Sequence, residues 1–178
     1  MKLLVALGNP GSQYEDTRHN IGWKFLDLLV EKHGGTWGGK KFQGEFGNGQ
    51  IYGESCLFLK PQTWMNKSGE SVAPAISFYK LKAEDVVLIY DDIDLSAGVV
   101  KARKGGGHGG HNGVRSILQL TGNDGFGRIK LGVGRPAQGD VSSWVLGRMS
   151  PDELRDLEEL MLPSGEQRLE AMFREARS

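Results

Sequence analysis

The chain alternates between short apolar runs and segments in which apolar residues recur every three or four positions. The first pattern predicts buried β-strands and the second predicts amphipathic α-helices. The run VVLIY at 86–90 is the most hydrophobic of the short runs and is typical of a central strand in an α/β sheet. Strands are expected at residues 2–7, 45–52, 55–59, 86–90, 99–104 and 128–133.

Helix signals stand between most of these strands. Asn20 occupies the position of an N-cap before an amphipathic segment that ends at the glycine pair 34–35. A second helix is expected at about 67–79, although Pro74 lies inside it. A third is expected at 113–120.

The C-terminal part of the sequence predicts further helix. Ser-Pro-Asp-Glu at 150–153 is a capping box with proline at the first helical position. We expect Pro163 to break this helix, with Ser164 and Gln167 capping a final one. Strands that alternate with helices predict an α/β fold: a mixed, twisted sheet with helices on both faces, in three layers. The length fits one domain over 1–178, with a helical tail from about residue 150.

The composition excludes several classes of protein. A single cysteine, Cys56, rules out a disulfide framework and a multi-cysteine metal site. Cys56 opens a predicted apolar strand, and no G-x-S-x-G motif occurs, so neither residue type suggests a catalytic nucleophile. The apolar stretch within the first 11 residues is too short for the hydrophobic region of a signal peptide. No apolar run elsewhere approaches the length of a membrane span. We expect a cytoplasmic protein without membrane contact.

The zero net charge hides a basic segment. Residues 95–135 carry seven Lys and Arg but one acidic residue, whereas the segments on either side of it are neutral or acidic. Clustered Lys and Arg suggest contact with a polyanion. A solvated strand surface remains the alternative.

Polar and glycine-rich segments follow the predicted strands. In open α/β sheets, a ligand crevice lies beyond the carboxyl ends of the strands, so these segments are expected to form one site. They are GNPG at 8–11, TRHN at 17–20, TWMNKSG at 63–69, IYDDID at 89–94 and GGGHGGHNG at 105–113.

The glycine-rich segment does not predict a nucleotide site. Residues 105–110 fit G-x-G-x-x-G, but the strand before them is polar and basic, whereas a dinucleotide fingerprint follows a buried strand. The acidic residue about 20 positions on, Asp124, lies in a predicted turn. No G-K-[ST] follows, which excludes a P-loop. A nucleotide-dependent oxidoreductase is therefore disfavoured.

The same region does not predict a metal site. Asp91 and Asp92 point to opposite faces of a strand, so they cannot easily share a metal with Asp94. His108 and His111 are three residues apart in a glycine loop, unlike the paired histidines of a metalloprotease helix. We expect no metal and no cofactor.

His19 is the histidine best placed for chemistry. It directly precedes the expected helix cap Asn20, and the positive end of a helix dipole disfavours the imidazolium form. A neutral ring can act as a general base near pH 7. Asp91, at the end of the central strand, could fix the tautomer of this histidine. A purely structural histidine in a capping turn is the alternative.

Five blocks together resemble the bacterial peptidyl-tRNA hydrolase family. The match covers nearly all of the chain up to about residue 150 and is looser in the tail beyond it. The combination is specific although no single block is. In order along the chain the blocks are GNPGSQYEDTRHNIG, KPQTWMNKSG, YDDIDL, GGGHGGHNG and KLGVGRP.

The resemblance implies an enzyme that hydrolyses the ester between a peptide and the 3′ end of tRNA, and so recycles tRNA. His19 matches the catalytic histidine of the family, and Asp91 matches the carboxylate that supports it. Asn9 matches an asparagine related to discrimination between blocked and free amino groups. Asn66 and Asn112 match asparagines that hold the peptide and the 3′ end.

The resemblance implies further contacts with the substrate. Tyr14 and Trp64 would line the groove, and Met65 would form part of its wall. His111 is placed among the residues that contact the substrate.

The resemblance also gives the basic segment a purpose. Arg103 and Lys130 match a clamp for tRNA phosphates, which positions a nucleic acid without reading its sequence. We expect a monomer whose partner is peptidyl-tRNA. A non-catalytic RNA-binding protein of the same fold is the alternative, but the presence of His19, Asp91 and the three asparagines argues against it.

Overall fold

The computed structural model describes residues 1–177 and contains one seven-stranded sheet in the order β2-β3-β4-β1-β5-β7-β6. The four central strands, β4, β1, β5 and β7, run parallel, and β2, β3 and β6 join the sheet antiparallel. The strands are β1 Lys2–Ala6, β2 Thr36–Lys41, β3 Gly44–Ile51, β4 Glu54–Pro61, β5 Val86–Asp92, β6 Val100–Lys104 and β7 Gly127–Gly132.

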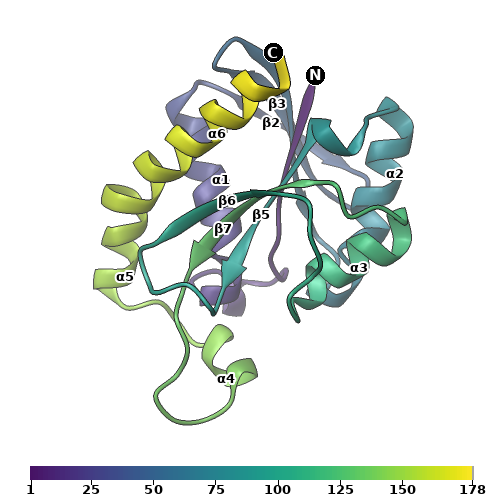
Figure 1. The fold of residues 1–178 in the computed structure, drawn as a ribbon. Coiled ribbons are helices and arrows are strands. Elements are labelled where there is room, and N and C mark those ends of the chain that lie inside the picture. Colours follow the sequence, from purple (N-terminus) through teal and green to yellow (C-terminus); the bar gives the residue numbers. More distant parts are fainter. Residues whose placement is uncertain (178) are drawn as a thin grey trace.

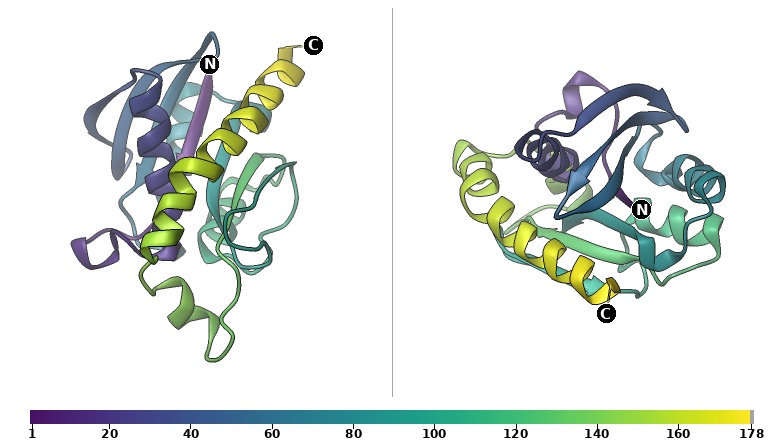
Figure 2. Two further views of the ribbon diagram at one scale, coloured as in Figure 1. Left: turned by 90° about the vertical axis from the view of Figure 1, so that its left-hand side faces the viewer. Right: turned by 90° about the horizontal axis from the view of Figure 1, so that it is seen from above.

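Helices cover both faces of this sheet, as the sequence predicts (Figures 1 and 2). α1 and α6 pack on one face, while α2 and α3 pack together on the other. Among the described residues, no helix is both long and apolar enough to cross a membrane. The helices are α1 Ile21–Lys32, α2 Gly69–Tyr79, α3 Asn112–Thr121, α4 Val141–Val145, α5 Pro151–Asp156 and α6 Leu162–Arg177.

The alternation of side chains along β1 divides the core in two. Leu4 and Ala6 belong to the cluster beneath α1 and α6, whereas Leu3 and Val5 belong to the cluster beneath α2 and α3. All four are fully buried, because a central parallel strand is covered on both faces. Cys56 is also buried, in agreement with the structural role expected for it.

One strand and one α-helix were not expected from the sequence. β2 contains Gly38 and Gly39, is mostly exposed, and has a bulge between Trp37 and Gly39, so it lacks the apolar alternation of a buried strand. The short helix α4 was also missed. Its N-cap Asp140 accepts a hydrogen bond from the Ser143 amide at 2.7 Å.

The expected break at Pro163 is wrong. α5 continues through a π-helical turn, Leu157–Met161, directly into α6, and Pro163 and Ser164 lie inside that helix. A proline lacks an amide hydrogen and its ring clashes with the carbonyl four residues earlier. The wider π turn just before it provides the room that an uninterrupted α-helix would lack. Ser164 and Gln167 therefore lie within this helix instead of at the start of a separate final one.

Candidate active site

A cavity of about 810 Å³ opens at the carboxyl ends of the parallel strands. The segments after β1, β4 and β5 converge there, as expected for a parallel sheet. Of the described residues that the sequence assigned to the site, only Tyr14 does not line this cavity. The others are Asn9, His19, Trp64, Met65, Asn66, Asp91, Arg103, His111, Asn112 and Lys130.

A close helix–sheet approach brings His19 to the end of β5. His19 lies in a 3₁₀ turn, Arg18–Asn20, that leads into α1. Gly22 is the second residue of α1, and a Cβ there would lie only 2.7 Å from the carbonyl oxygen of Ile89. A glycine is therefore needed for α1 to pack this closely against β5. The imidazole Nδ1 of His19 consequently lies 2.8 Å from Oδ2 of Asp91.

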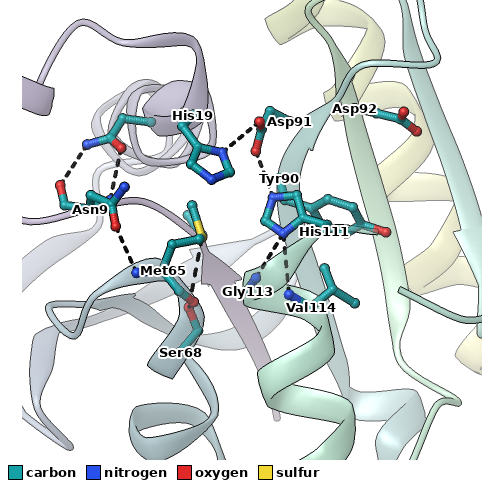
Figure 3. Close-up of polar contacts among 12 residues, drawn as sticks. Asn9, His19, Met65, Ser68, Tyr90, Asp91, Asp92, His111, Gly113 and Val114 are labelled. Carbon is teal, nitrogen blue, oxygen red and sulfur yellow. Dashed lines mark hydrogen bonds and ion pairs between the residues drawn. The ribbon is translucent and has the colours of Figure 1, made fainter. Parts of the chain in front are cut away.

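Asp91 holds a second histidine, which the sequence analysis did not foresee. Its Oδ1 lies 2.8 Å from Nε2 of His111 (Figure 3). The other ring nitrogen of His111, Nδ1, accepts hydrogen bonds from the amides of Gly113 and Val114 and so caps α3. Because Nδ1 accepts, it carries no proton, and His111 must donate to Asp91 as the neutral Nε2–H tautomer.

The carboxylate therefore orients His19 as well. Asp91 is an acceptor in both contacts, so Nδ1 of His19 donates to it and Nε2 is left as the basic nitrogen. Among the described residues, no group forms a hydrogen bond with Nε2 of His19. The side chain of His19 is 14% exposed and that of Asp91 2%, so only the histidine is open to the cavity.

The ionisation of the pair departs from the sequence-based expectation. Burial alone would lower the pKa of His19, but the charge and hydrogen bond of Asp91 raise it above the ordinary value of 6.5. The expected effect of the helix dipole is thus outweighed, and that prediction was wrong in direction. Burial would likewise raise the pKa of Asp91, yet His19 and His111 hold it well below its usual range.

Asn9 is fixed as a hydrogen-bond donor. Its side-chain Oδ1 accepts from the Met65 amide at 2.7 Å, which leaves the side-chain NH₂ for a ligand. The backbone of Asn9 is held by Asn20, whose side-chain oxygen accepts from the Asn9 amide and whose nitrogen donates to the Asn9 carbonyl, both at 2.9 Å. Asn20 occupies the N-cap position of α1 but makes no capping hydrogen bond, contrary to expectation.

The remaining predicted residues lie around the rim. Asn66 and Asn112 are exposed, and Trp64 is 51% exposed although it is a large aromatic residue. Tyr14 makes an edge-to-face contact with Trp64, with 5.8 Å between ring centroids, and so touches a residue of the cavity without lining it. Met65 is buried in the wall of the cavity.

A further wall of the cavity comes from α4, which the sequence analysis did not assign to the site. Arg18, next to His19, anchors this segment: its guanidinium bonds both carboxylate oxygens of Glu153, donates to the Trp144 carbonyl, and lies 3.5 Å from the centroid of the Trp144 ring. Burial alone would raise the pKa of Glu153, but Arg18 keeps it below its ordinary value. The α4 segment contributes Val141, Ser142, Val145 and Leu146 to the cavity.

The cluster also has the composition of a metal site. The possible ligand atoms of His19, Asp91 and His111 lie within 4.8 Å of one another. However, the nitrogens nearest the carboxylate are those that bond to it, and both carboxylate oxygens are used. A cation between them would have to replace both hydrogen bonds. The metal site considered from the sequence included Asp91 and His111, together with Asp92, Asp94 and His108, but not His19.

The basic segment reaches the same cavity. Arg103 on β6 and Lys130 on β7 line it, with Lys130 Nζ 3.9 Å from an oxygen of Asp92. Arg103 packs over the glycine loop, since a Cβ on Gly106 would lie 2.9 Å from its guanidinium carbon. Arg128, by contrast, is 1% exposed, so it belongs to the interior rather than to a solvated basic face.

Comparison with known proteins agrees with this geometry. A peptidyl-tRNA hydrolase family model matches residues 3–177. The chain is 51% identical over 160 residues to peptidyl-tRNA hydrolase from Geobacter sulfurreducens, covering 90% of this chain and 83% of that protein. It is 47% identical over 174 residues to the enzyme from Geobacter sp. strain M21, covering 98% and 92%.

The fold comparison gives the same result. A solved structure of peptidyl-tRNA hydrolase from Acinetobacter baumannii superimposes with a TM-score of 0.84 at 36% identity, covering 96% of this chain and 95% of that one. The sequence match spans both the sheet and the C-terminal helices. The chain belongs to the peptidyl-tRNA hydrolase family.

Proposed function

We propose that the chain hydrolyses the ester that joins a peptide to the 3′ end of tRNA, with His19 as the general base. The observation that carries this proposal is the orientation of His19. Its Nδ1 donates to buried Asp91, and within residues 1–177 no group bonds its Nε2, while the side chain lines the cavity. To activate water, a general base must present an unprotonated nitrogen at the cavity, and the bond to Asp91 fixes His19 in the tautomer that does so.

The reaction needs one water molecule and no covalent intermediate. Nε2 of His19 takes a proton from water, and the resulting hydroxide attacks the ester carbonyl carbon. The C–O bond to the ribose then breaks, and the proton on His19 passes to the departing ribose oxygen. Asp91 stabilises the imidazolium between these two transfers, because its carboxylate already accepts from Nδ1.

Asn9 is the group we assign to the polar part of the substrate. Its NH₂ faces the ligand because its oxygen is held by the Met65 amide. A neutral amide can donate to the developing oxyanion or to a carbonyl of the blocked amino group without the cost of burying a charge. We assign Asn66, Asn112 and the exposed ring of Trp64 to the peptide and the 3′ end.

The remaining assignments concern the RNA. We assign Arg103 and Lys130 to tRNA phosphates, supported by their position at the same cavity as His19. His111 contributes by holding Asp91 rather than by chemistry of its own. We also propose that the protein acts as a single-domain monomer in the cytoplasm, and that the chemical step uses no metal.

The test is release of an N-acetylated amino acid from N-acetylaminoacyl-tRNA, with unblocked aminoacyl-tRNA as the comparison. We expect release from the blocked substrate, and the same rate after treatment with a chelator. A short mimic of the 3′ end is needed as a second substrate, because magnesium also folds tRNA. Binding without release would favour the non-catalytic alternative. Loss of activity on the mimic, restored by one equivalent of a metal, would assign the His19–Asp91–His111 cluster to that metal.

A further inference from the structure

Arg128 is the largest fully buried side chain among the described residues. It lies on β7, and its guanidinium remains charged at any physiological pH. Among the described residues, none of the salt bridges includes it. An ionised group in the interior is costly unless its hydrogen bonds are satisfied, so its partners indicate what it is retained for.

The partners of Arg128 are neutral, and most belong to the backbone. Nη1 donates to the carbonyl of Gly107 at 3.0 Å and to the hydroxyl of Tyr90 at 3.2 Å, and Nη2 donates to the carbonyl of Gly106. The guanidinium also donates to the carbonyls of Asp124 and Phe126. One side chain thus joins β5, the turn before β7 and the glycine loop before α3.

The glycine loop has little conformational preference of its own. Gly105, Gly106, Gly109 and Gly110 all have positive φ, which leaves the backbone many alternatives when it is not tethered. The turn before β7 supplies two tethers, as the amides of Gly105 and Gly106 donate to the carbonyls of Phe126 and Asp124. Arg128 holds the carbonyl side of the same segment.

The glycine loop is in turn the surface against which Arg103 rests. The Arg103 guanidinium packs over Gly106, and Gly107 lines the cavity beside Arg103 and Lys130. We infer that Arg128 is a positioning residue: its planar fork fixes the carbonyls of Gly106 and Gly107 and thereby places Arg103 for the RNA. This inference rests on the assignment of Arg103 to tRNA phosphates made under Proposed function.

The experiment compares Arg128→Met and Arg128→Lys on full-length N-acetylaminoacyl-tRNA and on the short 3′-end mimic. We expect both variants to raise KM for the full-length substrate by roughly tenfold, which corresponds to the loss of one charge-assisted hydrogen bond between Arg103 and a phosphate. The value of kcat, and the kinetics on the short mimic, should change little. Lysine keeps the charge but not the fork, so its failure to rescue identifies geometry as the cause. Full rescue by lysine, or equal loss on both substrates, would overturn the inference.

A double-mutant cycle tests whether Arg128 acts through Arg103. We expect Arg103→Ala combined with Arg128→Met to raise KM no more than Arg103→Ala alone, whereas additive effects would contradict the inference. Arg168→Met is the matched control, because Arg168 also donates to a backbone carbonyl, that of Val100, but from the α6 face of the sheet. It should leave KM unchanged.

Two further arms keep the result decisive. If Arg128→Met does not fold, Tyr90→Phe removes the side-chain partner of the Arg128 guanidinium and leaves Arg128 itself in place. We then expect a smaller rise in KM, for the full-length substrate alone. An unchanged KM would count against the inference. Arg103→Ala by itself separates the two proposals. If Arg103→Ala does not change KM, the assignment of Arg103 to RNA fails. If Arg103→Ala raises KM but Arg128→Met does not, only the role proposed for Arg128 fails.

Discussion

The two functional regions of the cavity are built in opposite ways. The histidine–aspartate cluster consists of short side chains, buried or nearly so, each held by hydrogen bonds of about 2.8 Å or by the end of α3. The region that we assign to RNA, called the RNA-facing region below, consists of long cationic side chains. Arg103 is exposed there, and Lys130 is half-buried with its Nζ 3.9 Å from an Asp92 oxygen. The first region is already held by hydrogen bonds, and we expect the second to become ordered when the substrate binds.

This difference fits the role that we propose for each region. A base must hold one nitrogen within hydrogen-bond reach of water, so its geometry has to be preorganised. A phosphate contact far from the ester binds the ground state and the transition state equally, so it does not require the same precision. Loss of the first should lower kcat, and loss of the second should raise KM.

The largest effect is expected from His19→Ala. Removal of a general base costs roughly 10²–10⁴-fold in turnover. Affinity for tRNA and the melting temperature should change little, because His19 is at the cavity and not in the core. Single-turnover release from N-acetylaminoacyl-tRNA measures the rate, and His33→Gln is the control, since His33 bonds Glu166 at the far end of α1. Turnover near that of the wild type would remove His19 from the mechanism.

A smaller loss is expected from Asp91→Asn. A hydrogen bond to a charged group contributes about 1.5–3 kcal/mol, which corresponds to about a 10- to 150-fold reduction in kcat. Asp92→Asn is the matched comparison, because the Asp92 side chain lies away from both histidines (Figure 3) and contacts Lys130 only at 3.9 Å. A greater loss from Asp92→Asn would contradict the assignment of the two carboxylates.

The same pair predicts a pH dependence. Asp91 raises the pKa of His19, and the base works only when Nε2 is unprotonated, so activity should fall as pH decreases through a midpoint above 6.5. Asp91→Asn removes the cause of that shift and should move the midpoint to lower pH while lowering the maximum rate. The kcat/KM profile on the short mimic measures both. A midpoint that does not move in Asp91→Asn would show that another group titrates.

The sequence predicted the parts of the molecule that depend on local patterns. Buried strands such as 86–90, and the polar segments after them, are defined by contiguous residues. The sheet and the position of the cavity could therefore be predicted from the sequence. β2 was missed because it is an exposed edge strand with two glycines, and the helix through Pro163 because a π turn absorbs the proline. These features depend on long-range packing, which a local pattern does not contain.

The same reasoning separates the parts of the site. Asn9, His19 and Asp91 stand out by residue type at the ends of strands and helices. The roles of Asn20, Arg18 and Arg128 depend instead on partners up to 135 positions away in the chain. Arg128 in particular has the sequence context of a surface cation, and only its burial shows otherwise.

The smallest effect is expected on the RNA-facing side, from Arg103→Ala and Lys130→Ala. Each should raise KM for full-length peptidyl-tRNA and leave kcat and the short mimic nearly unchanged. Each lost contact should also flatten the dependence of log affinity on log salt by somewhat under about one unit, since fewer counterions are released.

Lys101→Ala is the control, because Lys101 is exposed on the same strand as Arg103 but does not line the cavity. If Lys101→Ala weakened binding as much, the contribution would be that of a diffuse basic surface. If the mimic were impaired as much as the full substrate, Arg103 and Lys130 would belong with the histidine–aspartate cluster, and the division between a preorganised and a substrate-ordered region would not hold.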